Sequence, residues 1–189
     1  ANKNNINNVT FLNSDIFDDV VQDNFFDVVW CSGVLHHTKD SKKGFEIISK
    51  WVKEDGLIII GVYNKIGRLR TNFRQLIYKL CNKNNFSKKM ISILDPYLRK
   101  SLSDEKRRAW FRDQYEHPLE RKHSIDEVIN WFETNDISFV GSIPSPDFEF
   151  KTISEMDGDK GTYLNRLFAQ VTMLFSHLGG EGGLCIVVG

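Results

Sequence analysis

The segment "FDVVWCSGVLHHTKD", Phe26–Asp40, decides the fold class of this chain. It opens with a nearly continuous apolar run, which is typical of a parallel strand buried on both faces. The run ends in the small residues Cys31–Gly33, which allow a ligand to approach the backbone closely. Two adjacent histidines, His36 and His37, follow at once. The segment therefore predicts a buried strand that delivers polar groups to one edge of a sheet.

The residues around this segment complete a βαβ unit. Apolar residues recur with helical spacing over Asp40–Lys53, and Asp55-Gly56 is expected to end that helix. The run "LIIIGVY", Leu57–Tyr63, predicts a second buried strand, and a strand–helix–strand order implies a right-handed parallel crossover. Upstream, "VTFLN", Val9–Asn13, predicts a further short strand.

A basic segment interrupts this α/β order. The whole chain has a formal net charge of zero, yet residues 64–123 hold 16 Lys/Arg against 6 Asp/Glu. The pattern of this segment is helical, so residues 65–122 are predicted to form a basic helical insertion. After it, Ser124 and Glu127 predict a capping box at the start of a helix. The runs "ISFVGSI" and "LCIVV" predict the last two strands.

Length and composition fit one domain without disulfides or membrane spans. The chain has 189 residues, and its three cysteines stand far apart, which favours reduced, buried thiols in a cytoplasmic protein. No run approaches the roughly 18 apolar residues of a membrane span, so no membrane partner is expected. The ends look cut, because Ala1 is no initiator methionine and the chain stops directly after a strand. We therefore expect a fragment of a longer protein.

The paired histidines allow three interpretations. A metal site needs three or more ligands, and the other histidines show no HxH or HxxxH spacing, so no metal is expected. Acid/base work suits an imidazole because its pKa lies near neutrality. The third interpretation is structural: His36 and His37 only shape the entry to a helix. The last two interpretations remain open.

Two other groups of polar residues follow strand-like runs. Asp15 comes directly after a short run, where it could accept a hydrogen bond from an amine such as that of adenine, or simply cap a turn. Tyr63 and Asn64 close the second strand of the βαβ unit at the same sheet edge, and Arg68 follows. Arg68 could hold an anionic substrate, or it could lie on a solvated helix face.

Taken together, "NVTFLNSDIFD", "FDVVWCSGVLHHTKD" and "GLIIIGVYN" resemble the second half of a class I S-adenosylmethionine-dependent methyltransferase. The likeness spans Asn8–Asn64 and returns at "SIDEVINWFETNDISFVGSIPS" and "EGGLCIVVG". It implies an α/β fold with a Rossmann-like doubly wound sheet, mostly parallel, with an antiparallel last strand and a helical lid. Residues 1–189 would then form one methyltransferase-like domain that lacks the N-terminal strands, with residues 65–122 as the lid.

The resemblance also implies S-adenosyl-L-methionine as the cofactor. The implied cofactor-binding residues are Ser14, Asp15, Ile16, Cys31, Ser32 and Gly33. The first three would surround the adenine, and the last three would line the methionine side. His36 and His37 would stand where methyl donor and acceptor meet, and one of them would help by taking a proton. Because the family works mainly by orienting an activated sulfonium, the histidine would be a helper and not a nucleophile.

Two features of the family are missing from this sequence. The glycine-rich first loop (GxGxG) and the acidic residue that binds the ribose are absent, and we expect them upstream. A small-molecule acceptor, possibly anionic, is favoured over nucleic acid, because Trp110, Phe111 and Tyr115 are few and fit core packing as well. A nucleotide-dependent oxidoreductase and a non-catalytic interaction domain remain as rivals. The sequence carries no information on the oligomeric state.

Overall fold

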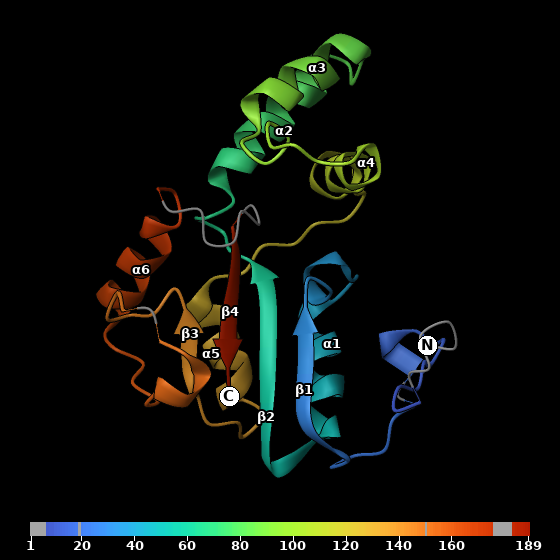
Figure 1. Ribbon diagram of the computed structural model, residues 1–189. Coiled ribbons are helices and arrows are strands. Elements are labelled where there is room, and N and C mark those ends of the chain that lie inside the picture. Colours follow the sequence, from blue (N-terminus) through green and yellow to red (C-terminus); the bar gives the residue numbers. More distant parts are fainter. Residues whose placement is uncertain (1–6, 19, 150, 176–182) are drawn as a thin grey trace.

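The computed structural model describes residues 7–18, 20–149, 151–175 and 183–189, and these contain one four-stranded sheet with the order β1-β2-β4-β3 (Figure 1). The strands are β1 (Phe26–Ser32), β2 (Val52–Tyr63), β3 (Gly141–Ile143) and β4 (Leu184–Val188). β1 and β2 are parallel, whereas β4 runs antiparallel to both β2 and β3. Three strands thus share one direction and the last runs against them. This confirms the α/β fold with an antiparallel last strand.

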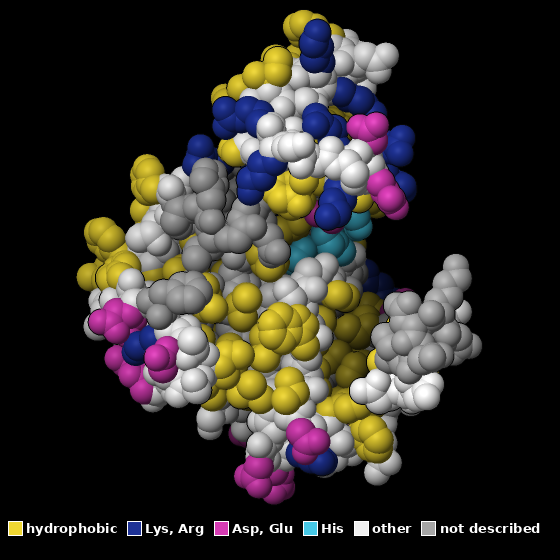
Figure 2. All heavy atoms as spheres, in the orientation of Figure 1, with side chains coloured by type: hydrophobic (Ala, Val, Ile, Leu, Met, Phe, Trp, Pro, Cys, Tyr) yellow, Lys and Arg dark blue, Asp and Glu magenta, His cyan; other side chains and the backbone are white. Residues whose placement is uncertain are grey.

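Helices cover one face of this sheet. α1 (Ser41–Ile48) connects β1 to β2, and α5 (Ile125–Glu133) lies beside it behind the sheet (Figure 1). The rings of Phe45 and Phe132 stack at 5.3 Å between centroids, in a core that the two helices share with the sheet. α6 (Tyr163–Thr172) packs against α5. Figure 2 shows hydrophobic side chains on the other face of the sheet. Val28 and Trp30 are exposed and alternate along β1 with Val29 and Cys31 of the core, so they point to that face.

The boundary between α1 and β2 differs from the prediction. The helix expected to reach Lys53 ends at Ile48, and β2 already begins at Val52. Asp55-Gly56 therefore lies within the strand and ends no helix. The reason is that the backbone N–H of Phe25 donates to the Trp51 carbonyl at 3.0 Å, which brings this segment into the sheet early. The pairing then slips, because β2 holds extra residues opposite the start of β1.

The strand predicted over Val9–Asn13 is wrong. The segment has no strand structure, and Val9, Phe11 and Leu12 are exposed. β-rich composition produces a strand only where a neighbouring strand pairs with it, and no described residue does so here. A 3₁₀ turn, Ile16–Asp18, follows and packs against α1.

The basic insertion forms a separate helical lobe above the carboxyl ends of β1 and β2 (Figure 1). Its helices are α2 (Leu69–Leu80), α3 (Asn85–Leu94) and α4 (Asp104–Phe111), followed by a π-helical turn, Arg112–Glu116. Their small core consists of Tyr78, Ile91, Leu98 and Tyr115. The two ends of the insertion meet, because His123 N–H donates to the Tyr63 carbonyl at 2.8 Å. Its predicted role as a lid stays a prediction.

The three cysteines form no disulfide with one another. Cys31 and Cys185 are buried, Cys81 is half-buried, and all three are free thiols. Burial raises the pKa of Cys31 to about 11 and that of Cys185 to about 12, so both thiols stay protonated and unreactive. Within the described ranges, no helix combines the length and the apolar character needed to cross a membrane.

Candidate functional site

The carboxyl ends of β1 and β2 bring several of the predicted residues together beneath the insertion. β1 ends at Ser32, and Gly33 then adopts a φ of +79°, a conformation that glycine reaches without strain. The Gly33 N–H donates to the Gly61 carbonyl at 3.0 Å, and a Cβ at Gly33 would meet nothing within 4 Å. A 3₁₀ turn, Leu35–His37, follows directly. Space therefore remains open beside the turn that the sequence predicts to bind a ligand.

His36 points into the protein interior. Its side chain is 1% exposed, and its Nδ1 accepts a hydrogen bond from the Tyr63 N–H at 3.3 Å. The buried Nε2 has no hydrogen-bond partner among the described residues. Burial, reinforced by the neighbouring His37 and Arg68, lowers the pKa of His36 to about 3. The ring is therefore neutral at physiological pH.

His37 lies on the insertion side of the same turn. Its Nδ1 donates to the Leu119 carbonyl at 2.9 Å, and its Nε2 lies 3.4 Å from Oδ1 of Asp113. Burial alone would lower the pKa of His37, but the Asp113 carboxylate and the Leu119 carbonyl raise it above its ordinary value. The ring of His117 lies 3.9 Å from that of His37. The pKa values of the two neighbouring histidines are thus shifted in opposite directions.

Asp113 connects the insertion to the sheet edge. Its Oδ2 accepts a hydrogen bond from the Tyr63 hydroxyl at 2.9 Å, and the Gln114 side-chain amide donates to the same hydroxyl at 2.7 Å. The hydrogen bond from His37 holds the pKa of Asp113 well below its usual range. Asp113 lies in the π-helical turn, a distortion frequent at functional sites. It therefore presents a permanent negative charge to the His37 ring.

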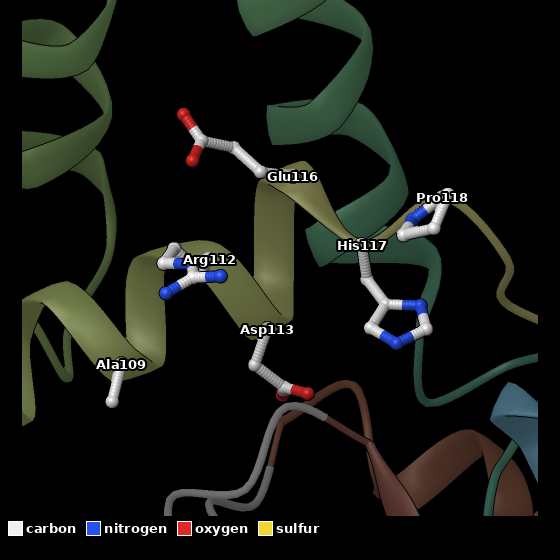
Figure 3. A pocket seen from close by; sticks show the side chains of 6 residues that line it. All are labelled: Ala109, Arg112, Asp113, Glu116, His117 and Pro118. Carbon is white, nitrogen blue, oxygen red and sulfur yellow. The ribbon is translucent and has the colours of Figure 1, made fainter.

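An open pocket of about 470 Å³ adjoins this pair (Figure 3). Its lining residues come from the end of α4 and the turn after it, and they are Ala109, Arg112, Asp113, Glu116, His117 and Pro118. In Figure 3, Asp113 and His117 extend to the same side of the turn, and Glu116 points the other way. The pocket thus places a carboxylate and an imidazole beside His37.

Arg68 is fully buried and is bound by the insertion. Its Nη2 lies 2.5 Å from Oε2 of Glu120, and its Nη1 donates to Oε1 of Gln114. Its guanidinium also lies over the Tyr63 ring, 3.8 Å from the centroid. Burial would raise the pKa of Glu120, but the Arg68 guanidinium lowers it below the ordinary value. The solvated helix face considered for Arg68 is therefore wrong, and its predicted substrate contact stays a prediction.

Asn64 forms the corner at which β2 enters the insertion. Its Oδ1 accepts hydrogen bonds from the N–H groups of Ile66 at 2.9 Å and Gly67 at 3.0 Å. Its Nδ2 donates to Oε1 of Gln170 at 2.7 Å. The amide is buried and satisfied by the protein. Its predicted substrate contact stays a prediction, and its hydrogen bonds fix the corner between β2 and the insertion.

The predicted adenine-binding residues lie apart from the insertion, in the N-terminal segment beside α1 (Figure 1). Ser14 and Asp15 are exposed, and Ile16 packs against the main core. One carboxylate oxygen of Asp15 accepts a hydrogen bond from the Phe17 N–H at 3.0 Å. This is the turn-capping contact considered for Asp15, and the cofactor contact of all three residues stays a prediction.

The side chains of a serine, a histidine and a glutamate are also in contact with one another in that order. His123 Nε2 lies 3.0 Å from the Ser41 hydroxyl, and its Nδ1 lies 2.7 Å from Glu127. The order is that of a hydrolase triad, but Ser41 is buried and its hydroxyl donates to the Leu35 carbonyl at 2.9 Å. The serine is therefore a packing residue. In the part of the chain that the structure describes, no group of three or more His, Cys, Asp or Glu could hold a metal ion.

The sequence did not single out Asp113, Gln114 or Glu120. Each meets its partner across a large sequence separation, so no local spacing reveals the contact. One signal was present: only six acidic residues lie within the basic residues 64–123. Of these six, Asp113 contacts His37 at the sheet edge, and Glu120 binds Arg68 at the start of the insertion. An acidic residue inside a basic insertion is therefore a useful marker.

The Rossmann-like sheet, with polar residues at the carboxyl ends of its strands, is the architecture of class I methyltransferases. Comparisons with known proteins lead to the same class. A family model described as a methyltransferase domain matches residues 1–133, and the chain belongs to this family. The chain is 26% identical over 132 residues to the uncharacterized protein syc1184_c of Synechococcus, covering 61% of this chain and 32% of that protein. It therefore spans about a third of the length of this curated relative.

Solved structures show the same fold. PKMT2 from Rickettsia typhi matches with a TM-score of 0.58 at 10% identity, over 93% of this chain and 37% of that one. The same protein in complex with AdoHcy matches with a TM-score of 0.64 at 12% identity, over 99% and 40%. The family match confirms the methyltransferase resemblance, and the structures confirm the Rossmann-like fold. Membership also agrees with S-adenosyl-L-methionine as the cofactor.

Proposed function

We propose that this domain transfers the methyl group of S-adenosyl-L-methionine to a small-molecule acceptor bound between the sheet edge and the insertion. The observation that carries the proposal is the His37–Asp113 pair at the carboxyl ends of β1 and β2, together with an open pocket in the insertion that Asp113 also lines. Ligands of open α/β sheets bind outside the carboxyl ends of the strands. The pair thus lies at the end of the sheet where ligands bind in folds of this kind.

The residues at the end of β1 fit the cofactor. The open space at Gly33 allows a ligand to approach the backbone closely, and Gly33 can keep its φ of +79° with that ligand present. The residues that would hold the cofactor are Ser14, Asp15, Ile16, Cys31, Ser32 and Gly33. When bound, the cofactor supplies an activated methyl group, so the protein's task is orientation and proton removal.

In this proposal His37 takes the proton from the acceptor. The Leu119 carbonyl fixes the proton of the neutral ring on Nδ1, which leaves the lone pair on Nε2. The 3.4 Å contact from Nε2 to Asp113 is long, so an acceptor hydroxyl can replace it. Asp113 then stabilises the imidazolium that forms. His36 is neutral and buried, and it supports the ring of Tyr63 at 3.9 Å.

The acceptor we propose is small and possibly anionic. Arg112 lines the pocket, and it offers a guanidinium to a carboxylate or phosphate. Arg68 and Asn64 hold the corner of the insertion, while Tyr63 reaches the pocket through its bond to Asp113. A nucleotide-dependent oxidoreductase has no support in the family match. A non-catalytic interaction domain remains the rival, and it predicts cofactor binding without turnover.

The test is methyl transfer by the full-length protein. It is incubated with methyl-labelled S-adenosyl-L-methionine and either the small-molecule or the protein fraction of a cell extract. Label in the small-molecule fraction is expected. His37→Asn should lower turnover by about 10²–10⁴-fold, the usual contribution of a positioned base. Label only in protein would overturn the acceptor class, and no label anywhere would favour the interaction domain.

Two measurements separate catalysis from binding. Asp113→Asn should lower turnover and move the acid limb of the pH–rate profile, whereas Asp104→Asn, a matched change at the exposed start of α4, should do neither. Calorimetry with S-adenosylhomocysteine should give the same affinity for the His37→Asn variant as for the native protein. A loss of that affinity would make His37 part of the cofactor site and not the base.

A further inference from the structure

α2 carries an apolar stripe that faces solvent. Four of its large hydrophobic residues recur at intervals of four, three and four positions, which places them on one side of the helix. They are Leu69, Phe73, Leu76 and Leu80, with exposed fractions of 52%, 64%, 52% and 72%. The opposite side of α2 bears Tyr78, which is buried in the core of the insertion. The stripe is therefore surplus to the packing of the lobe.

The neighbouring helix adds to this surface. α3 packs against α2 and exposes Phe86 at 71% and Ile93 at 62%. Between Leu69 and Leu94 there is no acidic residue, and the basic residues are Arg70, Arg74, Lys79, Lys83, Lys88 and Lys89. Figure 2 shows hydrophobic and basic side chains together on the outer part of this lobe. Lys88 is paired with the Glu116 carboxylate at 2.9 Å, whereas Lys79 and Lys89 are exposed. The α2–α3 surface thus combines exposed apolar groups with an excess of basic side chains.

We propose that the α2–α3 surface docks on a membrane of anionic phospholipids. Helices with an apolar side and a side rich in Lys and Arg lie in the plane of the bilayer interface, with the apolar side chains among the acyl chains. Basic residues near such a surface are attracted by its negative potential. Both parts of the α2–α3 surface are used by this partner: Phe73 and Leu76 insert, and Lys79 and Lys89 contact the headgroups.

Other partners use only part of this surface. A second copy of the chain, paired through the same stripe, would bring two sets of basic residues together with no acidic residue between Leu69 and Leu94 to balance them. Nucleic acid would engage the basic residues through its phosphates, but it gives the exposed leucines no partner. An anionic lipid surface satisfies the charge and the apolar area together.

Docking of this kind needs no membrane span. α2 has 12 residues and is about 18 Å long, short of the roughly 30 Å of a bilayer core. The sequence predicted no membrane partner because it has no apolar run long enough to span a bilayer. A helix that lies on the membrane surface needs no such run. The docking rests on α2 and α3 alone and does not depend on the proposed methyl transfer.

The test is co-sedimentation of the full-length protein with vesicles. We expect the protein to pellet with vesicles of equal parts phosphatidylglycerol and phosphatidylcholine, and to stay in solution with phosphatidylcholine alone. Added salt should weaken the binding because the basic residues are screened. Failure to pellet with the anionic vesicles, or equal pelleting with both kinds, would overturn the proposal.

Matched variants distinguish binding by the α2–α3 surface from non-specific binding through other exposed hydrophobic residues. Phe73→Gln with Leu76→Gln should abolish pelleting, and Lys79→Gln with Lys89→Gln should weaken the partition coefficient by about fivefold for each lysine removed. The control is Leu164→Gln with Phe168→Gln on α6, where the native residues are 63% and 64% exposed. This control should bind as the native protein does. Equal loss in the control, or a dimer in solution that Phe73→Gln dissociates, would overturn the assignment.

Discussion

The sheet layer and the insertion are built on different kinds of core. The sheet layer buries aliphatic and aromatic side chains such as Phe45, Ile58 and Ile60 between α1, α5 and the strands. The insertion relies on tyrosines whose hydroxyls are bonded: Tyr78 donates to Glu116 at 3.0 Å, and Tyr115 donates to Asp95 at 2.6 Å. Apolar burial is non-directional, whereas a hydrogen bond fixes an orientation.

This difference explains where the site lies. The sheet layer supplies an edge that ends in small residues and in the rings of His36, His37 and Tyr63. The insertion supplies the charges, because Asp113 in its π-helical turn reaches His37 at the sheet edge, and Glu120 near its end holds Arg68 near its beginning. The candidate site exists only where the two cores meet. Breaking one core at a time therefore tests how far each region folds and works alone.

The largest change in stability is expected from substitutions that create a cavity in one of the two cores. Phe45→Ala should lower the free energy of unfolding of the whole domain by about 3–5 kcal/mol, and Ile91→Ala should cost about 2–5 kcal/mol but open mainly the insertion. Both native side chains are fully buried. Urea denaturation measures the loss in the free energy of unfolding, and amide hydrogen exchange shows which elements are destabilised. If Ile91→Ala raised exchange in β2 as much as in α2, the two cores would be one unit.

The next effect concerns the Arg68–Glu120 ion pair, which joins the beginning and the end of the insertion where it meets the sheet layer. Glu120→Gln leaves the Arg68 charge buried without its carboxylate partner, and such a loss costs about 3–5 kcal/mol. The free energy of unfolding from urea denaturation measures it. The control is Asp27→Asn, which breaks the exposed Lys53 pair and should cost less than about 1 kcal/mol. Equal, small effects would mean that the insertion does not depend on this contact.

Much of the sheet layer could be predicted from the sequence, because its elements are defined locally. The apolar runs of β1, β2 and β4 and the amphipathic pattern of α5 each appear as an unbroken stretch. The errors came where pairing decides the outcome. Asp55-Gly56 reads as a stop signal but lies within β2, and Val9–Asn13 reads as a strand but has no described partner.

The site was predictable only on the sheet side. His36 and His37 follow a strand directly, so their place at the sheet edge follows from the chain itself. Their different environments do not, because Asp113, Leu119 and Tyr63 come from other elements. From the sequence alone, His36 and His37 have the same expected pKa. Tertiary packing lowers the pKa of His36 and raises that of His37.

The two histidines also predict a pH dependence. The pKa of His36 falls from 6.5 to about 3 on folding, so between these values the unfolded chain binds the proton and the folded chain does not. Stability should therefore fall as the pH falls below 6.5, by about 1.4 kcal/mol for each pH unit. His37 acts in the opposite sense: its raised pKa contributes stability at low pH that is lost as the pH rises through the folded value.

Urea midpoints from pH 4 to 8 test this difference. His36→Gln keeps an acceptor for the Tyr63 N–H and removes the titrating ring, so its stability should fall less steeply below pH 6.5 than that of the native protein. His37→Asn should lose the contribution present at low pH and leave the His36 slope in place. If the two variants gave the same pH profile, the opposite environments of the rings would be refuted.

The smallest effect compares one helix cap in each region. Ser124 begins α5 and accepts a hydrogen bond from the Glu127 N–H at 3.1 Å in a half-buried setting. The reciprocal half of the predicted capping box is replaced, because the Glu127 carboxylate binds His123 and Lys65. Ser124→Ala should therefore cost about 1 kcal/mol, the ordinary value of a single cap.

Ser103 begins α4 in the insertion, and its bond from the Lys106 N–H is longer, at 3.4 Å, and exposed. Water can replace an exposed acceptor, so Ser103→Ala should cost about 0.5 kcal/mol or less. Urea denaturation of both variants measures the difference. A Ser103→Ala cost equal to that of Ser124→Ala would show that α4 is held as firmly as α5, and that the insertion contributes more to the stability of the domain than its small, hydrogen-bonded core implies.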